Sequence, residues 1–270
     1  MQSAPAFAGS AAWNVGNGDW TNNQNWNPMS VPGVSGTSSG NADTATFSSG
    51  SGSVTDAVTN RELGQIIFNN AGSLGNFTIG SSSNTIYFND SNNSGAPAIN
   101  ETGTATSNLS ETIQSNIMAM GANGASANDI RISTSNGFSG TITLSGNISS
   151  TATSGVTGIR VITSGVDSLA NVNNVVVMSG AISNGGGTNQ VAVAHARDGV
   201  LVLSGPNTFS GGYSQGLSDD ADSITRVGVS STGLANAPTS GAFGTGVLTW
   251  DSGEIPPTAQ RRIQSAIRSP

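Results

Sequence analysis

The sequence predicts an all-β fold, and within that class a parallel β-helix in which short strands are stacked coil upon coil. Three observations support this prediction. Gly, Ser, Thr and Asn make up 135 of the 270 residues and only 9% are charged, so helix-forming residues are too few for a bundle or an α/β sheet. Short aliphatic runs are separated by Gly, Asn or Ser, as strands are. A strand-and-turn motif also recurs along the chain.

Most of the predicted strands bury only one of their two faces. In them an aliphatic side chain alternates with Thr, Ser or Arg, which is the pattern of a strand lying on a core. The clearest runs are residues 64–68, 76–79, 85–88, 129–133, 141–145, 159–163, 174–178, 190–194 and 200–203. Because each run has one apolar face, another part of the chain must cover it.

A strand followed by a Ser-Gly step occurs three times. The copies align at residues 142–149, 176–183 and 201–208. Their glycines, which we predict to be structural repeat turns where Gly adopts a positive φ without a steric clash, are Gly146, Gly180 and Gly205. If each copy is one corner of a coil, the inward side chains of successive coils stack into one continuous core. These predicted inward residues include Ile142, Leu144, Met178, Leu201 and Leu203.

A second architecture stays open on the sequence. A β-sandwich or jelly roll also has many short strands joined by Gly-rich turns. Its hairpins favour Asn-Gly or Asp-Gly loops, and such pairs occur at residues 123–124, 136–137, 184–185 and 198–199. The stacked coil is favoured by the Ser-Gly alignment and by the many Asn residues, whose side chains form ladders along a stack.

The first part of the chain is rich in Trp. Trp13, Trp20 and Trp26 lie within fourteen residues. A stack of coils leaves an open core and open sheet edges at each end, so we predict that residues 13–50 cap a β-solenoid spanning residues 51–253. Alternatively, exposed Trp rings would form a stacking platform, which makes these three residues candidate carbohydrate contacts.

The two ends of the chain follow neither pattern. The Ala-Phe-Ala sequence at residues 6–8 has the small-x-small form of a signal-peptidase site. Residues 1–12 are therefore interpreted as the incomplete stub of an export signal, or as a disordered start. In residues 254–270, a Pro-Pro pair breaks the β pattern, and two Ile four residues apart favour a short helix. This tail is predicted to be irregular or helical.

The composition also excludes classes of function. The net charge is −7, the pI is about 4.4, and the cations are eight Arg, so nucleic acid is not expected as a partner. The chain has no Cys, which excludes disulfides and thiolate metal sites. No apolar run approaches the roughly 18 residues of a transmembrane segment. A surface without Cys or Lys and rich in Asn, Ser and Thr fits a secreted or cell-surface bacterial protein.

Two blocks of the sequence resemble a known family. The first is Trp-x-x-Gly-x-Gly-Asp-Trp, followed by Asn-Trp, Val-Pro and Asp-x-Ala-x-Phe, within residues 13–50. The second and more specific block is Val-Leu-Val-Leu-Ser-Gly-Pro-Asn-Thr-Phe-Ser-Gly-Gly at residues 200–212. Both look like bacterial proteins with autotransporter-associated β-strand repeats.

This resemblance implies a right-handed parallel β-helix in an exported passenger region, which serves as a surface stalk, an adhesin or a matrix component. It covers residues 13–50 and 200–250 well, and the middle of the chain only in style. Tyr213 stands where the family usually has Thr, and its Gly-Thr-Leu strand corresponds to residues 246–248, Gly-Val-Leu, after a long insertion. Members of the family commonly end in an outer-membrane barrel or a sorting tail. Residues 254–270 resemble neither of these, so the resemblance does not indicate the mode of surface anchoring.

Few residues are of the types that carry catalysis. The single histidine, His195, continues the aliphatic face of a predicted strand and is followed closely by Arg197 and Asp198. No Gly-x-Ser-x-Gly turn appears at a place where a strand meets a helix, as the nucleophile of a Ser-His-Asp triad requires. His195 is therefore interpreted as a structural side chain at a strand end, and it remains the candidate base if the protein is an enzyme.

The other charged residues form two small groups. One is the acidic run Asp219, Asp220 and Asp222, which lacks the spacing of a known Ca²⁺ loop. We interpret these residues by default as charged side chains of a solvent-exposed loop. Ca²⁺ binding stays open. The other is Arg131 and Arg160, which alternation places on the outer faces of their strands without a carboxylate pair in register. Neither group predicts a catalytic residue, a metal site or a cofactor.

The sequence thus leads to three hypotheses of function. The first is a non-catalytic extracellular structural or adhesive β-solenoid, with host or matrix glycans or other surface proteins as partners. The second is a polysaccharide lyase or hydrolase on the same fold, using His195, Arg197, Asp198 and the acids at 219–222. The third is a carbohydrate-binding module that uses the N-terminal Trp residues. The ligand and the oligomeric state are not indicated by the residues.

Overall fold

The computed structural model shows an almost entirely β protein. It describes residues 9–35, 43–56, 60–70, 74–89, 98–103, 109–120, 130–135, 138–163, 173–197, 199–216, 223–234 and 236–250. Among these residues the only helix is one 3₁₀ turn, Asn23–Asn25, and the remaining regular elements are strands. The all-β prediction is confirmed. The export-signal motif at residues 6–8, the acids at 219–222 and the predicted helical tail lie outside the described residues.

The strands form three large sheets and one small one. The ten-stranded sheet, in spatial order, contains β3 (Trp26–Asn27), β1 (Ala11–Trp13), β5 (Thr44–Phe47), β8 (Gln65–Asn70), β11 (Ile99–Gly103), β14 (Ile130–Thr134), β17 (Val156–Thr163), β19 (Gln190–Ala196), β21 (Tyr213–Gln215) and β25 (Leu248–Trp250). The eight-stranded sheet contains β2 (Gly18–Asp19), β6 (Gly50–Thr55), β9 (Leu74–Ile79), β12 (Leu109–Ile113), β15 (Gly140–Leu144), β18 (Asn174–Met178), β20 (Gly199–Leu203) and β22 (Ser223–Val227). The five-stranded sheet contains β4 (Val34–Ser35), β7 (Asn60–Leu63), β10 (Thr85–Asn89), β13 (Asn116–Met120) and β16 (Ile148–Ser150), and the small one pairs β23 (Thr232–Leu234) with β24 (Ala237–Ser240).

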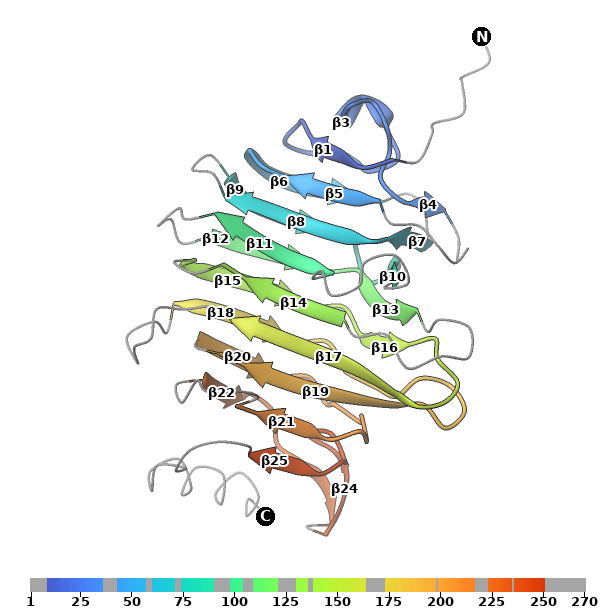
Figure 1. The fold of residues 1–270 in the computed structure, drawn as a ribbon, viewed down its shortest axis with the longest axis vertical. Helices are drawn as coiled ribbons and strands as arrows, with labels where there is room; N and C mark the ends of the chain where they lie inside the picture. Colours follow the sequence, from blue (N-terminus) through green and yellow to red (C-terminus); the bar gives the residue numbers. More distant parts are fainter. Residues whose placement is uncertain are drawn as a thin grey trace.

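The chain visits the three large sheets in a fixed order. From β5 to β14 each strand of the ten-stranded sheet is followed by one of the eight-stranded and one of the five-stranded sheet. Neighbouring strands in a sheet therefore come from successive circuits, which lie one below another in Figure 1. After β18 the third side continues as the isolated parallel bridge between Ile148 and Ile182. The topology is compatible with a coil of stacked rungs.

The direction of pairing distinguishes the two predicted architectures. Among the strand pairs of the described residues, those of β1 with β3, β4 with β7 and β23 with β24 are antiparallel, and all others are parallel. A sandwich or jelly roll is built from antiparallel hairpins, so the pairing argues against that alternative. The parallel pairing of the repeated segments confirms the expectation from the Ser-Gly alignment.

The core lies between the sheets and continues from one circuit to the next. The predicted inward residues Ile142, Met178 and Leu203 are all completely buried. Successive circuits place equivalent residues in register, and one such column contains Ile66, Ile99, Ile132, Val161, His195 and Gln215. The column begins with aliphatic side chains and ends with polar ones, so this part of the interior becomes more polar toward the C-terminal circuits.

The Ser-Gly steps stack as predicted, but for a different physical reason. Gly146, Gly180 and Gly205 do not have the positive φ that we expected of them. Instead, a β-carbon on Gly180 would collide with the carbonyl of Gly146, and one on Gly205 with the carbonyl of Gly180. Glycine is required at these positions because the backbone of the preceding circuit lies in van der Waals contact, leaving no space for a side chain.

Asparagine side chains join the circuits along one corner. The Oδ1 atom of Asn116 accepts a hydrogen bond of 3.0 Å from the backbone N–H of Asn147, and Asn147 accepts one of 3.0 Å from Ala181. Each Asn thus binds the backbone of the following circuit. This is the ladder that the Asn content predicts.

Candidate functional site

The N-terminal tryptophans pack together over the first circuits. The ring centroids of Trp13 and Trp26 are 4.9 Å apart and those of Trp20 and Trp26 4.8 Å apart, with edge-to-face geometry. The cluster continues into the stack through Phe47 and Phe77, whose ring centroids are 5.0 Å apart. Strand β5, which contains Phe47, pairs in parallel with β8. The predicted cap and the stack therefore share β5.

The tryptophan side chains are not available as a stacking platform in this arrangement. The exposed fractions of Trp13, Trp20 and Trp26 are 2%, 1% and 1%. Their indole N–H groups donate to the carbonyls of Gly16, Pro32 and Trp20 respectively, at 3.1, 2.9 and 2.8 Å. Stacking against a sugar requires an exposed ring face, so the placement of these rings argues against the predicted carbohydrate contacts and favours the cap.

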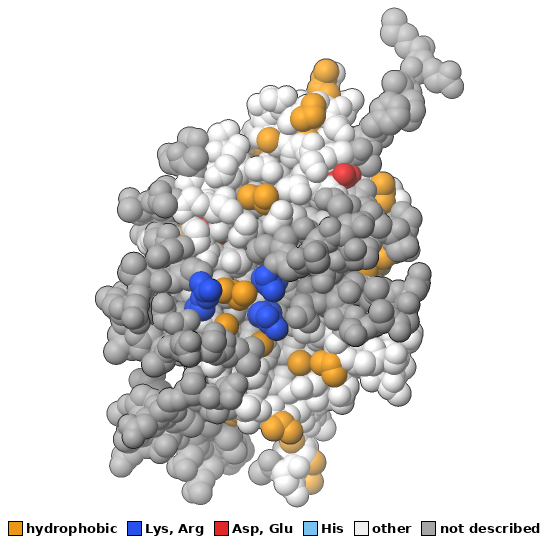
Figure 2. Space-filling model, viewed as in Figure 1, with side chains coloured by type: hydrophobic (Ala, Val, Ile, Leu, Met, Phe, Trp, Pro, Cys, Tyr) orange, Lys and Arg blue, Asp and Glu red, His pale blue; other side chains and the backbone are white. Residues whose placement is uncertain are grey.

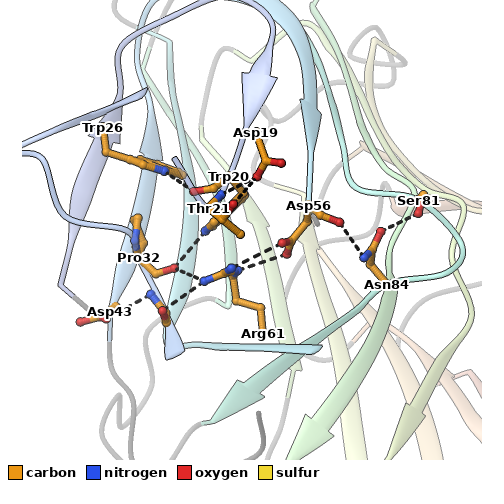
Figure 3. A network of polar contacts seen from close by, with 11 residues as sticks. Asp19, Trp20, Thr21, Trp26, Pro32, Asp43, Asp56, Arg61, Ser81 and Asn84 are labelled. Atoms are coloured by element: carbon orange, nitrogen blue, oxygen red, sulfur yellow. Dashed lines mark hydrogen bonds and ion pairs between the residues drawn. The ribbon is translucent and has the colours of Figure 1, made fainter. Parts of the chain in front are cut away.

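A buried ion pair fixes the cap to the circuit below it. The Arg61 guanidinium donates to both carboxylate oxygens of Asp56, at 3.1 and 3.4 Å, and to the carbonyls of Pro32 and Gly33 (Figure 3). It also lies 5.7 Å from the ring centroid of Trp20. Both side chains of the ion pair are at least nine-tenths buried.

This network extends to both sides of the ion pair. Asp43 accepts a hydrogen bond from the backbone N–H of Gly33, and Asn84 donates one to the carbonyl of Asp56 (Figure 3). The network therefore joins the cap loop to two circuits of the five-stranded side. Sequence reasoning missed it, because nothing in the spacing of these residues shows that they meet.

His195 lies inside the core, with no exposed surface. Its Nε2 atom is 3.0 Å from the Thr163 hydroxyl and its Nδ1 atom 3.3 Å from the Thr225 hydroxyl. Thr225 also contacts the hydroxyl of Tyr213, which donates to Gln215. Burial lowers the pKa of His195 to about 3, so the imidazole is neutral at physiological pH. These features support the structural interpretation of His195.

The structure shows no catalytic arrangement between His195 and the described residue Arg197, which the enzyme hypothesis also uses. Arg197, which directly follows β19, is exposed and has a φ of 67°. Asp198 and the acids Asp219, Asp220 and Asp222 lie outside the described residues. Within the described part of the chain, no group of three His, Asp or Glu side chains is arranged to hold a metal ion.

A pair of carboxyl groups is buried between the ten-stranded and eight-stranded sheets. Glu101 in β11 is 1% exposed and Glu111 in β12 is completely buried. One oxygen of Glu101 accepts hydrogen bonds from Ser135, and one oxygen of Glu111 accepts from the N–H of Phe77. The second oxygen of each has no hydrogen-bond partner within the described structure.

Both carboxyl groups have raised pKa values. The pKa of Glu111 is raised to about 8, chiefly by burial; the N–H of Phe77 lowers it and the charge of Glu101 adds to the increase. Burial raises the pKa of Glu101 to about 6, although the hydrogen bonds from Ser135 lower it. A polymer cannot reach either carboxyl in this arrangement, so the pair does not have the accessibility that glycoside hydrolysis needs. Sequence reasoning missed this pair.

The charged residues on the outer surface have a different arrangement. Arg131 in β14 and Arg160 in β17 are direct neighbours in the parallel register. The residues on either side of each arginine are buried, so both side chains point to the outer face of the ten-stranded sheet. In Figure 2, which shows this face, the basic side chains lie together near its middle. This confirms the outward placement that alternation predicts and adds the in-register pairing.

The search for membrane-spanning helices and the comparisons with known proteins both bear on the identity of the chain. In the residues that the structure describes, no helix has the length and apolar character needed to cross a membrane. Comparisons with family models, with curated proteins and with solved structures find no match for the chain. The family resemblance of residues 13–50 and 200–250 therefore stays a prediction, and the function has to be argued from the stacked sheets and their surfaces.

Proposed function

We propose that this protein is a non-catalytic structural or adhesive protein of the bacterial surface or extracellular matrix, built as a right-handed parallel β-helix like a passenger region. The observation that carries the proposal is the in-register stacking of strands in three largely parallel sheets around one core. Such an architecture extends by adding rungs, each contacting only its neighbours. A stack of such rungs is stiff and presents a repetitive surface.

The bonds between circuits support this role. Backbone hydrogen bonds join every circuit to the next along the large sheets, and the Asn116 and Asn147 side chains add further bonds along one corner. The buried Trp cluster covers the first circuit, and the Arg61–Asp56 pair fixes it there. These contacts make the stack resistant to separation of its circuits and protect its first sheet edges.

The enzyme alternative receives less support from the geometry. His195, the one imidazole of the chain, lies in the core with a lowered pKa. A general base must come within hydrogen-bond distance of the proton that it removes. The placement of His195 therefore favours the non-catalytic proposal over the lyase or hydrolase.

Two measurements test the proposal. Antibodies against the purified chain should label the outside of intact producing bacteria or the matrix around them. Pectate, alginate and chitin incubated with the chain, with and without Ca²⁺, should keep their length. Labelling confined to the cell interior, or shortening of any polymer above a buffer control, would overturn the proposal.

A further inference from the structure

The two ends of the stack differ in how they close the core. On the eight-stranded side, Leu144, Met178, Leu203 and Val227 form one in-register column of inward side chains. The first three are completely buried, whereas Val227 is 41% exposed. Val227 lies on β22, the last strand of this sheet in the described residues, so no further strand of the described sheet covers it. The column is therefore incompletely covered at the C-terminal end.

Other apolar side chains of the last circuit, which runs from β22 through the β23–β24 hairpin to β25, are also partly exposed. Leu248 on β25 is in register with Tyr213, and both Leu248 and Phe243 pack against the core without being fully buried. Leu234 and Val247 are 72% and 75% exposed. Large apolar side chains gathered at one place on a surface mark a site of interaction between proteins. The last circuit therefore has the composition of a contact surface.

The same end of the stack has two sheet edges. Among the described strands, β22 and β25 are the last of the eight-stranded and ten-stranded sheets, and both lie toward the end of the molecule opposite to β1 and β3 (Figure 1). An edge strand presents backbone N–H and C=O groups that can pair with a strand of another chain. Charged side chains on an edge discourage such pairing, and Arg226 is the only charged residue in the described part of the last circuit. Pairing of two such edges therefore meets little electrostatic opposition.

The N-terminal end of the stack does not offer a matching surface. There β3 turns back and pairs with β1 in the antiparallel direction, and Trp13, Trp20 and Trp26 cover the first circuits with exposed fractions of only 1% to 2%. A second copy placed with this end against the last circuit would present a closed cap in place of an open core. The described surface that combines sheet edges with exposed core side chains is the last circuit itself.

A two-fold arrangement of two copies brings two last circuits together. Because the two edges then run in opposite directions, β22 pairs antiparallel with β22 of the second copy in an isologous interface. An axis that passes through Thr225 places Arg226 opposite Ile224 of the second copy, so the two arginines do not face each other directly. Inward side chains stay inward on both sides of such an axis, and Val227 is then covered by the core of the second copy.

We infer that two copies of this chain associate end to end through their last circuits, with antiparallel pairing of β22. The contact continues the relationship that holds each described circuit to the next, in which strand edges pair and inward side chains stack. The inference goes beyond the proposed function and does not depend on it. The resulting dimer has a Trp cap at each of its two ends.

Light scattering coupled to size-exclusion chromatography tests the inference at micromolar concentrations of the full chain. We expect a mass of twice the 26.8 kDa of one chain. Val227→Asp should raise the dissociation constant by at least about tenfold, because association would bury its charge. Val156→Asp is the matched control, since Val156 is 50% exposed at the start of β17, and it should leave the mass of the dimer unchanged. Circular dichroism checks that both variants keep their strands.

Fluorescent labels at the two ends test the direction of association without changing β22 or β25. The chain has no Cys, so Leu234→Cys and Met29→Cys each give one labelling site, at positions that are 72% and 70% exposed. Energy transfer between donor and acceptor copies should be strongest when both are labelled at residue 234. The inference is wrong if the chain is monomeric, if Val227→Asp weakens association no more than Val156→Asp, or if transfer is stronger between two labels at residue 29 or between residues 29 and 234.

Discussion

The carbonyl group of Gly146 occupies the space that a β-carbon on Gly180 would need. The same relationship recurs between Gly180 and Gly205, and the carbonyl of Ser115 lies against Gly146 in the same way. Four successive circuits are thus in direct backbone contact at one corner. The closeness of this contact, and not the conformation of any one glycine, fixes the distance between the circuits there.

Gly180→Ala should therefore destabilise the fold by about 1–3 kcal/mol, the typical cost of overpacking. Urea unfolding followed by circular dichroism measures the effect. Gly186→Ala is the matched control, because a β-carbon there would meet its nearest atoms only at 3.9 Å. Equal stability of the two variants would show that the circuits can separate at this corner without cost.

Removing Arg61 should loosen the cap. Arg61→Leu removes the guanidinium donor from the buried Asp56 carboxylate and from the Gly33 carbonyl, whereas the Pro32 carbonyl keeps its hydrogen bond from the indole N–H of Trp20. Breaking a buried ion pair from one side costs about 3–5 kcal/mol. The emission of the Trp cluster should shift to longer wavelength at lower urea concentration than in the native chain. Arg226→Gln, at an exposed position, should leave the transition in place; an equal shift in both variants contradicts the role given to Arg61.

The buried carboxyl pair should make the protein less stable as the pH rises. The folded-state pKa values of Glu101 and Glu111 are about 6 and about 8, above their ordinary value of 4.5. The unfolded chain therefore releases these protons at a lower pH than the folded chain does. The stability that the protonated pair contributes is fully present below pH 4.5 and is lost progressively up to about pH 8. Urea unfolding at pH 5, 7 and 9 measures this decline.

Glu111→Gln should remove most of that decline and stabilise the chain at pH 9, since the amide oxygen still accepts from Phe77. Glu101→Gln provides the comparison and should have a smaller effect, because the pKa of Glu101 is raised less. A Glu111→Gln variant whose stability falls with pH as steeply as that of the native chain would show that the carboxyl is not buried in solution.

His195 should remain neutral over the physiological range of pH. Its folded-state pKa of about 3 lies below the ordinary value of 6.5, so the stability that the neutral imidazole contributes is present above pH 6.5 and is lost as the pH falls toward 3. As the only histidine, it gives one unambiguous set of imidazole signals in NMR spectra. These signals should not shift between pH 5 and 8, whereas the chain in urea should titrate near 6.5; a midpoint near 6.5 in the folded protein contradicts the burial.

Much of the fold follows from local patterns in the sequence. Alternation in residues 141–145 identifies Ile142 and Leu144 as inward, and the Ser-Gly alignment matches the circuits that the structure stacks. Alternation also places Arg131 and Arg160 outward. These inferences succeed because the direction of a side chain in a strand depends only on its position along that strand.

The charged and polar clusters could not be found in this way. Arg61 meets Asp56 and two carbonyls of the cap loop, and Glu101 lies near Glu111 across two different sheets. These contacts depend on the length and path of each loop between two strands. Loop lengths here vary from circuit to circuit, as the unequal spacing of Gly146, Gly180 and Gly205 shows, so sequence separation does not indicate which side chains share a rung.

Composition and alternation act within a few residues, and they were enough to indicate short one-sided strands with glycine at recurrent corners. Which strands become neighbours follows from the folded arrangement, and with it the Arg131–Arg160 pairing, the buried carboxyl pair and the position of His195 in the core. Register between circuits is set by packing of the whole column of inward side chains. That packing is a property of several distant segments together, and no single segment contains it.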